Sequence, residues 1–367
     1  MYQPSKHNSY NKAQSVGPAA LFFLLLFASL PFLSVCGQGY TEEPDFRVVS
    51  YNVEKLFDCQ HDSLKNDYEY LPQSTRRWTP HRYYQKLNNI ARVLIAAGEG
   101  SPPELVALCE VENDSVLHGL TRRSLLRKAH YQYLMTHSAD SRGIDVALLY
   151  RPMYFKPLQV EALQVPQPHP DFRPTRDILY VCGQLLDTDS LHVFVVHFPS
   201  RAGGTAASEP YRLAAAKVLA DKVHAIQQHR ADARILIAGD FNDYPQSASI
   251  RKVLQATIPP TDGSCASPNK LYHLLAAKAA RQKSYGSYKF RGQWQLLDHL
   301  IVSGSLLHPS ASLCTSTSQA EVIRLPFLLT PDKKYHGTQP FRTYSGMRYT
   351  GGYSDHLPVS AVFHLRY

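Results

Sequence analysis

The chain has 367 residues, of which 44% are hydrophobic and 19% are charged. An apolar fraction of this size builds a substantial core, which excludes an intrinsically disordered chain, and the low charged fraction excludes a long coiled coil. Lysine and arginine number 39 against 30 aspartate and glutamate, so the formal net charge is +9. This balance favours an anionic partner such as nucleic acid or phosphorylated lipid, without choosing between them.

The N-terminal segment differs in composition from the rest of the chain. Lys6 and Lys12 precede an uncharged apolar run over residues 19–35, which Pro31 interrupts. The run is too short to span a membrane but has the length of the apolar core of an export signal. We therefore predict that residues 1–37 are a signal peptide and that the mature protein is exported. Without the two lysines its net charge falls from +9 to +7.

The location of the exported protein depends on how the signal ends. Small residues near Cys36 and Gly37 suit cleavage, which predicts a secreted or periplasmic protein. Residues 33–36 also loosely resemble a bacterial lipobox, which would leave a lipid on Cys36 and hold the protein at the outer membrane. No later segment is long enough for a transmembrane span, so we expect a monomer that is soluble or tethered by one lipid.

Short apolar runs and amphipathic segments alternate along the remainder of the chain. The apolar runs predict buried strands over residues 46–51, 105–111, 144–150, 178–186, 191–197, 235–238, 296–302 and 358–365. Apolar residues at helical spacing predict helices over 82–97 and 209–229, and a third helix is expected over 113–128. Stretches rich in proline and glycine, such as 331–353, are interpreted as long loops. We predict one layered α/β domain over residues 44–367, with sheets at its centre.

Polar residues follow several predicted strands at the point where each strand ends. They are Asn52, Glu110, Glu112, His197, Asp240, Asn242, Asp243, Asp298, His299, Asp355 and His356. Ligands and catalytic groups often collect at strand ends. Carboxylates suit a hard divalent cation, and nearby bases and imidazoles suit activation of water and stabilisation of charge on phosphate. The set favours phosphate ester hydrolysis; a calcium site without catalysis is the alternative, although imidazole is a poor ligand for hard cations.

Six short motifs carry a resemblance to a known family. They are Ser50-Tyr51-Asn52-Val53, Leu108-Cys109-Glu110-Val111, Val196-His197-Phe198-Pro199, Gly239-Asp240-Phe241-Asn242, Leu297-Asp298-His299 and Ser354-Asp355-His356-Leu357-Pro358. In this order they resemble the endonuclease/exonuclease/phosphatase superfamily, which includes deoxyribonuclease-I-like enzymes, over residues 46–363. Residues 142–150, 175–177 and 286–290 look like an exported bacterial branch of it. The resemblance implies a four-layered α/β sandwich, with two mostly antiparallel sheets packed face to face and helices outside.

The resemblance also implies a divalent-metal site. Glu110 is expected to be the principal ligand, with Asn52 and Asp355 nearby and with Mg²⁺, or Mn²⁺, as the cofactor. Strand alternation places Glu112 on the same face as Glu110, where it either shares the metal site or faces solvent.

Four further residues are expected to act on water and phosphate. By resemblance, Asp240 and Asn242 align or deprotonate the attacking water and hold the phosphate. His356 faces the phosphate, oriented and kept basic by Asp298. A carboxylate behind an imidazole raises the imidazole pKa and fixes its tautomer.

A second imidazole and two arginines would complete the site. His197 is expected to be that imidazole, with Asp145 as its carboxylate partner by analogy. Arg176 and Arg201 lie in or near loops that follow strands. Arginine suits bidentate contact with phosphate, so both are predicted to bind substrate.

The composition of residues 333–353 bears on the substrate. This segment mixes cations with tyrosines just before the last catalytic motif. Such mixing suits bases stacked beside a phosphate track, and a packed tyrosine-rich loop is the alternative. DNA or RNA is therefore the expected substrate. A lipid headgroup or inositol phosphate is the rival, and a catalytically silent binding module is less favoured. The chain shows no clear Trp- or Phe-rich hairpin of the kind that lipid enzymes often expose, because its only tryptophans are Trp78 and Trp294.

Overall fold

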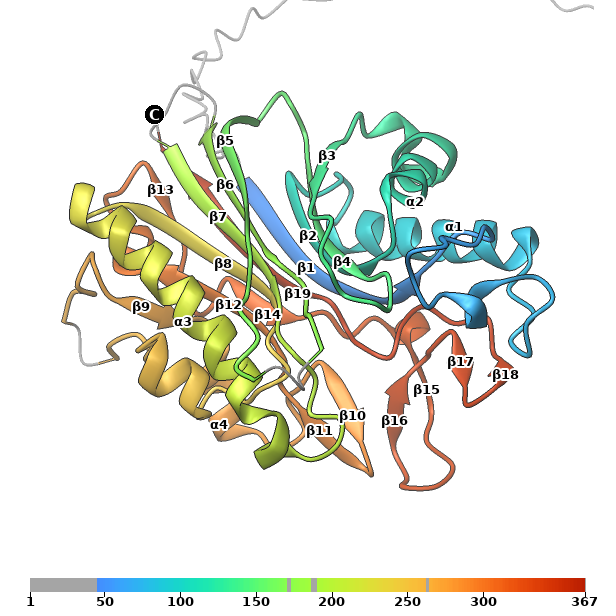
Figure 1. Cartoon of the computed structure of the whole chain (residues 1–367). Coiled ribbons are helices and arrows are strands. Elements are labelled where there is room, and N and C mark those ends of the chain that lie inside the picture. The colour runs from blue at the N-terminus through green and yellow to red at the C-terminus, as the bar shows by residue number, and fades with distance from the viewer. Residues whose placement is uncertain (1–44, 170–172, 186–189, 262–263, 367) are drawn as a thin grey trace, which may run out of the picture. The chain divides into compact units, whose positions relative to one another are not determined.

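The computed structural model describes residues 45–169, 173–185, 190–261 and 264–366, which belong to one compact unit. Two large sheets lie face to face at the centre of this unit, with helices on the outside (Figure 1). The predicted signal peptide and Cys36 lie outside the described residues. None of the helices in these ranges is both long and apolar enough to cross a membrane.

The first large sheet contains the first and last strands of the described chain. Its order is β13 (Leu313–Cys314), β19 (Val359–Leu365), β1 (Asp45–Leu56), β2 (Leu105–Val111), β4 (Asp145–Tyr150) and β3 (Gln132–Met135), and β14 (Ala320–Val322) also pairs with β19. β1 and β2 are parallel, and the other pairs are antiparallel. The parallel pair is connected through α1 (Pro80–Ala97), since parallel neighbours need a crossover connection.

The second large sheet is built in a similar way. Its order is β5 (Phe155–Leu163), β6 (Ile178–Leu185), β7 (Ser190–His197), β8 (Arg234–Asp240), β12 (Asp298–Ser303) and β9 (Leu271–His273). β7 and β8 are parallel and are connected through α3 (Thr205–His229), whereas the remaining pairs are antiparallel. Each sheet therefore contains one parallel pair in an otherwise antiparallel arrangement.

Both faces of the central strands of the second sheet, β7 and β8, are buried, which explains why these strands are continuously apolar. In β7, Val193 and Val195 belong to the core between the sheets, whereas Phe194 and Val196 belong to the core that contains residues of α3. Successive side chains of a strand point to opposite faces, so a strand covered on both sides is apolar at every position.

The helix α1 has clear signals at both ends. Thr79 is its N-cap and accepts a hydrogen bond from the Arg82 backbone, Pro80 occupies the first turn, and Gly98 follows the last turn. Its apolar stripe is buried against the first sheet, as predicted for residues 82–97. These local signals place the helix on the sheet that carries β1.

The predicted fold class is confirmed, and all eight predicted strands are present with bounds that differ by a few residues. The single helix predicted over 113–128 was wrong. The chain instead forms α2 (Asp114–His118), a π-helical turn (Gly119–Arg123) and a 3-10 turn (Leu125–Lys128). Ser124 is extended, and its hydroxyl accepts from Leu126 N, so the last turn begins separately.

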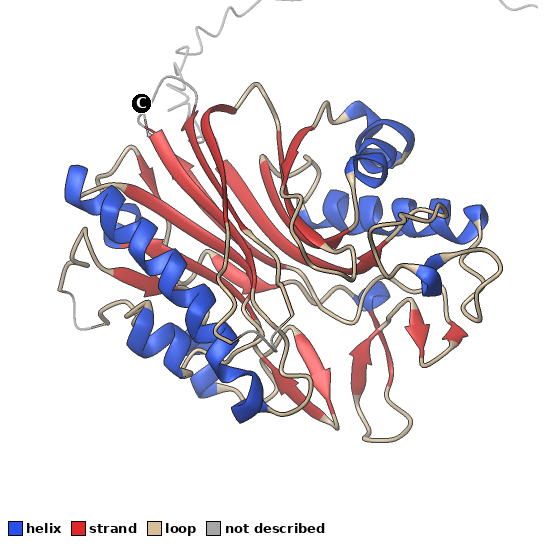
Figure 2. Cartoon of the chain, viewed as in Figure 1, coloured by secondary structure: helices blue, strands red, loops and turns tan. Residues whose placement is uncertain are grey.

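The stretch predicted as a loop over 331–353 contains small hairpins, which Figure 2 shows beside the sandwich. They are β15 (Leu329–Pro331) with β16 (Thr338–Pro340) and β17 (Tyr344–Ser345) with β18 (Arg348–Tyr349). A third hairpin, β10 (Tyr288–Phe290) with β11 (Gln293–Gln295), precedes β12, and α4 (Ala276–Arg281) follows β9. Strands of two or three residues have too little apolar periodicity to be predicted from sequence.

Candidate active site

Polar side chains from both sheets meet at one end of the sandwich. Asn52 on β1 donates from Nδ2 to Glu110 Oε1 on β2 (3.3 Å) and to Asp240 Oδ2 at the end of β8 (3.0 Å). β1 and β2 belong to the first sheet and β8 to the second, so the second of these bonds joins the sheets. The strand ends that the sequence marks as polar are therefore brought together in space.

A tight turn after β8 fixes the Asp240 carboxylate. Gly239 has φ 145°, and a Cβ there would lie 1.9 Å from Val196 O, so no larger residue fits. Asn242 has φ 49°, and its backbone N–H donates to Asp240 Oδ1 (2.8 Å). The Asn242 side chain donates to Phe198 O (3.0 Å), which ties the turn to the end of β7. The Asp240 and Asn242 side chains are thereby held beside each other.

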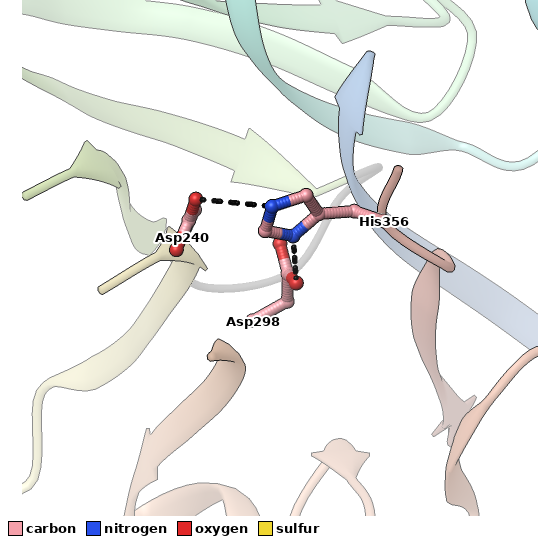
Figure 3. A group of neighbouring side chains, drawn as sticks. All are labelled: Asp240, Asp298 and His356. Carbon is pink, nitrogen blue, oxygen red and sulfur yellow. Dashed lines mark hydrogen bonds and ion pairs between the residues drawn. The ribbon is translucent and has the colours of Figure 1, made fainter. Parts of the chain in front are cut away.

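His356 lies between two carboxylates (Figure 3). Its Nδ1 is 2.6 Å from Asp298 Oδ2, and its Nε2 is 3.7 Å from Asp240 Oδ2. β12 pairs with β8 so that Asp298 stands opposite Asp240, which places both carboxylates within reach of one imidazole. The Tyr288 ring packs on the imidazole, with ring centroids 4.8 Å apart. The hydrogen bond to Asp298 thus fixes the ring at Nδ1, while Nε2 faces Asp240.

The electrostatics of this group separate a proton donor from a proton acceptor. Burial opposes the charged form of His356, but the carboxylates of Asp298 and Asp240 outweigh it and raise the pKa of His356 well above its usual value. Burial raises the pKa of Asp240 to about 7, with Asp298 adding to the effect and His356 opposing it. Near neutral pH the imidazole is therefore a cationic donor, and Asp240 is a base close to its midpoint.

The same three residues are the one tight group of candidate metal ligands within the described ranges. Their ligand atoms all lie within 4.8 Å of one another. The hydrogen bond between His356 and Asp298 already occupies part of this set, and imidazole is a poor ligand for a hard cation. We therefore interpret Asp240, Asp298 and His356 as a proton-transfer group.

His197, at the end of β7, supplies a second imidazole. Its Nε2 is 3.7 Å from Asp240 Oδ2 and 3.9 Å from Glu110 Oε1. Burial, followed by the positive charges of Arg176 and Arg142, lowers the pKa of His197 well below its usual value. This imidazole is consequently neutral at pH 7, in contrast to His356.

The predicted pairing of Asp145 with His197 was wrong. Asp145 instead accepts hydrogen bonds from Thr136 Oγ1 (2.6 Å) and Ser138 N (3.0 Å). Nδ1 of His197, the atom that a carboxylate partner would hold, has no hydrogen-bond partner in the described part of the chain. Thr136 and Ser138 belong to the turn between β3 and β4, so the Asp145 carboxylate serves that turn on its own sheet.

Three carboxylates lie near the predicted metal position. Glu110 accepts from the Asn52 amide, and the Arg342 guanidinium contacts both Asp355 and Glu54. Burial, and then the negative charge of Asp355, raise the pKa of Glu54 to about 7. Carboxylates that repel one another beside the Asn52 amide fit a hard divalent cation. Glu54 was missed by sequence reasoning, although it stands only two residues after Asn52.

The prediction for Glu112 was also wrong. Glu110 has φ 67°, and the β2–β4 register shifts between Cys109 and Val111. This bulge breaks the alternation on which the prediction depended. Glu112 is buried, and its Oε2 accepts from Asp58 N (2.7 Å), so it neither joins the metal position nor faces solvent.

Arg342 adds a positive charge at the edge of the site. Its Nη2 is 2.7 Å from Asp355 Oδ2, and its Nε is 3.7 Å from Glu54 Oε1. The side chain is 40% exposed, so the guanidinium is accessible to a ligand that enters the site. It comes from the segment between β16 and β17 and reaches the two acidic residues from outside the sandwich.

The two arginines predicted to bind substrate differ in position. Arg176 is only 2% exposed and donates to Asp140 Oδ2 (3.2 Å) and Phe198 O (2.6 Å), so it lies behind the site and does not fit the predicted contact. Arg201 is half-buried, donates to Gln295 Oε1 and lies 4.7 Å above the Tyr244 ring. Arg201 therefore stays a candidate for substrate contact.

Polar residues of α1 hold the segment that leads to His356. Lys86 Nζ donates to Thr343 Oγ1 (2.5 Å) and Tyr353 O (2.6 Å). Asn89 Nδ2 donates to the carbonyls of residues 351 and 352. Sequence reasoning missed both residues, because polar side chains at the border of an apolar stripe usually face solvent.

A known protein family matches nearly all of the described chain. The model of the Endonuclease/Exonuclease/phosphatase family matches residues 47–365. The chain belongs to this family. No curated protein matches the sequence.

Solved structures show the same fold at low identity. Humanized D. rerio TDP2 is 15% identical, with a TM-score of 0.52, over 87% of this chain and 99% of that one. An endonuclease/exonuclease/phosphatase family protein from Bacteroides thetaiotaomicron is 14% identical, with a TM-score of 0.51, over 89% and 99%. A functionally unknown conserved protein from Enterococcus faecalis V583 is 15% identical, with a TM-score of 0.50, over 88% and 100%.

The family membership defines the class of reaction. The chain is a hydrolase that acts on phosphate ester bonds, and enzymes of this family generally depend on a divalent metal. The acidic residues described above are compatible with that requirement.

Proposed function

We propose that the protein is an exported, Mg²⁺-dependent phosphodiesterase that hydrolyses DNA or RNA by in-line attack of water. The observation that carries this proposal is the arrangement of Asp298, His356 and Asp240, which places a cationic donor, His356 Nε2, 3.7 Å from a carboxylate base, Asp240 Oδ2. A net charge of +7 on the mature chain supports a polyanionic substrate.

Activation of water is assigned to Asp240 and Asn242. The Asp240 carboxylate, with a pKa of about 7, accepts the proton that the attacking water loses. The backbone and side chain of Asn242 hold this carboxylate, and the Asn242 amide contributes to the orientation of water and phosphate. A hydroxide formed in this way attacks phosphorus on the face opposite the leaving oxygen.

Stabilisation of phosphate charge is assigned to the two imidazoles and Arg342. His356 donates from Nε2 to a non-bridging oxygen while Asp298 holds Nδ1. His197 contributes a neutral N–H dipole, and the exposed Arg342 guanidinium meets the phosphate from outside. Donors placed where negative charge develops lower the barrier more than they strengthen substrate binding.

The metal position is assigned to Glu110, Asn52 and Asp355, with Glu54 beside them. When bound there, Mg²⁺ supplies positive charge to the phosphate oxygens and the leaving oxygen. Asn52 also donates a hydrogen bond to Asp240, so one side chain contacts both the metal position and the base.

Export is part of the proposal and is supported by the N-terminal composition. We expect a secreted or periplasmic monomer, or one that is held at the outer membrane by a lipid on Cys36. In either case the enzyme would encounter nucleic acid outside the cytoplasm.

The decisive experiment is hydrolysis by the purified mature protein. Plasmid, single-stranded DNA, RNA, sphingomyelin and a chromogenic diester should be compared with and without chelator, with His356→Ala as the inactive control. We expect nucleic-acid cleavage that chelator abolishes and Mg²⁺ or Mn²⁺ restores. Activity confined to sphingomyelin would replace the nuclease assignment by the lipid alternative, and full activity in chelator would refute the metal requirement.

A further inference from the structure

Two hairpins are joined at their tips next to the active site. Figure 1 shows β10–β11 and β15–β16 side by side, and β10 contacts β16. Lys289 Nζ lies 2.8 Å from Asp332 Oδ2 and donates to His336 O (2.9 Å). A Cβ on Gly292 would lie 3.0 Å from Tyr335 Cβ, so the two tips are in close contact. We call residues 289–293 and 332–337 the paired tips.

The paired tips expose aromatic rings among cations. Phe290 is 49% exposed and Tyr335 is 41% exposed, so both rings are accessible to a ligand. The Arg291 guanidinium lies 5.2 Å from the Phe290 ring, and Lys334 Nζ lies 5.2 Å from the Tyr335 ring. The single acidic residue in these ranges, Asp332, is already paired with Lys289. The surface is therefore basic and aromatic, and Phe290 provides the exposed aromatic hairpin that the sequence did not reveal.

The paired tips lie next to the active site, on the side where Tyr288 packs against His356. Tyr288 packs on the His356 imidazole and forms an isolated bridge with the same residue. Phe290 follows two residues later on the same strand, which corresponds to roughly 7 Å. A nucleic-acid strand advances about 3.4 Å per nucleotide in a duplex. The exposed rings thus lie within a few nucleotides of a phosphate held at His356.

We propose that the paired tips bind single-stranded nucleic acid next to the scissile phosphate. Bases would stack on Phe290 and Tyr335, while Arg291 and Lys334 meet the phosphates. The rings require free base faces, and a duplex exposes these only at its ends, so an unpaired strand is the preferred occupant. This inference rests on the proposed nuclease function and specifies its substrate.

Binding to an inactive protein tests the proposal without any hydrolysis. In the His356→Ala background, Phe290→Ala/Tyr335→Ala should weaken binding of a short single-stranded oligonucleotide by roughly tenfold or more, since stacking contributes strongly per base. Binding of a blunt duplex should change little. Fluorescence anisotropy measures both. An unchanged affinity for the single strand, or an equal loss for the duplex, would overturn the proposal.

The contribution of the two cations, Arg291 and Lys334, is measured by how the affinity depends on salt concentration. Arg291→Ala/Lys334→Ala should reduce the slope of log affinity against log salt for the single strand by roughly 1.4, which corresponds to two lost phosphate contacts. Arg251→Ala/Lys252→Ala removes two exposed cations beyond α3 and is the matched control. A slope that falls equally in both variants would show that only the net charge matters.

Two further measurements separate this inference from the proposed function. Tip variants in the wild-type background should melt at the wild-type temperature and hydrolyse a small chromogenic diester at the wild-type rate. If the wild-type enzyme cleaves no nucleic acid, the proposed function fails. If it cleaves single strands and the tip variants do so equally well, only the inference fails. Sedimentation with phosphatidylcholine and phosphatidylglycerol vesicles that depends on Phe290 would instead assign the tips to a membrane.

Discussion

Asp298 and His356 form a short hydrogen bond inside the protein, and the catalytic role that we propose for each depends on the other. His356→Ala should lower kcat/KM by roughly 10²–10⁴-fold, because a charge-stabilising donor is lost. Asp298→Asn should also lower the rate and shift the alkaline limb of the pH profile to lower pH, since the carboxylate that holds the His356 pKa high is removed. Steady-state kinetics across pH measures both effects.

The double variant is the critical control for this pair. Adding Asp298→Asn to His356→Ala should cost little more than His356→Ala alone, because residues that act as one unit are not additive. The assignment of Asp298 and His356 as one unit would be contradicted if the losses of kcat/KM in the two single variants multiply in the double variant. It would also be contradicted if Asp298→Asn leaves the pH profile of kcat/KM unchanged.

Arg342 contacts Asp355 at the predicted metal position, and this contact gives its substitution two opposite effects. Arg342→Gln should tighten Mn²⁺ binding, because a cation that competes for Asp355 is removed. It should also raise KM for a phosphodiester by roughly tenfold, because a charged hydrogen-bond donor to phosphate is lost. Titration calorimetry and steady-state kinetics measure the two effects separately.

Arg348→Gln, on the exposed hairpin β17–β18, is the control for net charge. It should leave the affinity for Mn²⁺ unchanged. Weaker Mn²⁺ binding by Arg342→Gln together with an unchanged KM would show that Arg342 only orders Asp355.

At the scale of elements, a pair of buried histidines connects β9 and β12 to the turn after β8. His273 Nδ1 accepts from the backbone of Leu275 and Ala276, so its Nε2 carries the proton and donates to His299 Nδ1. His299 Nε2 then donates to Asp243 O (2.9 Å). Every ring nitrogen has a partner, and each ring has one nitrogen that accepts, which requires both rings to be neutral. The pair thus supports the turn that carries Asp240 and Asn242.

This neutrality predicts a loss of stability in mild acid. Burial lowers the pKa of His299 to about 4, and burial followed by the charge of His299 lowers the pKa of His273. The same side chains titrate near pH 6.5 when unfolded. Below pH 6.5 the unfolded chain therefore binds more protons, and the free energy of unfolding falls as pH drops from about 6.5 toward 4.

The contribution of the histidine pair to this slope is measurable by denaturant unfolding. His299→Gln should make the fall in stability between pH 6.5 and 4 shallower, because one group that titrates differently in the two states is removed. His224→Gln, an exposed residue of α3, should leave the slope unchanged. Equal slopes in the wild-type and His299→Gln proteins would show that other groups govern the acid sensitivity.

At the scale of the whole molecule, the predicted export signal determines where the mature chain begins. The protein isolated from outside the cytoplasm should begin near residues 36–38, since the apolar run over 19–35 fits a cleaved signal. N-terminal sequencing and intact mass measure this, and an added lipid mass on Cys36 would identify the tethered form. A cytoplasmic protein that begins at Met1 would contradict the prediction.

Much of the fold was predictable because its signals are local. The stripe over 82–97 and the apolar runs of the central strands repeat with the period of one element, so they are visible in a short stretch of sequence. The hairpins over 329–349 were not predicted, because their strands are short and gain their order from contact with other segments. The break at Ser124 depends on a single extended residue, which no periodicity reveals.

The sequence by itself determined the class of chemistry. Asn52, Glu110, Asp240, Asp298 and His356 stand at strand ends in a fixed order, and their side chains define the acids, bases and imidazoles that are available. Only the tertiary structure decided which of them act together. Glu112 lies away from the site because a bulge at Glu110 interrupts the alternation of side chains along β2. Asp145 is bound by Thr136 on its own sheet and not by His197. Lys86, Arg342 and Phe290 gained their positions from segments distant in sequence, since contacts of that kind depend on how the two sheets and their insertions pack and not on any local pattern.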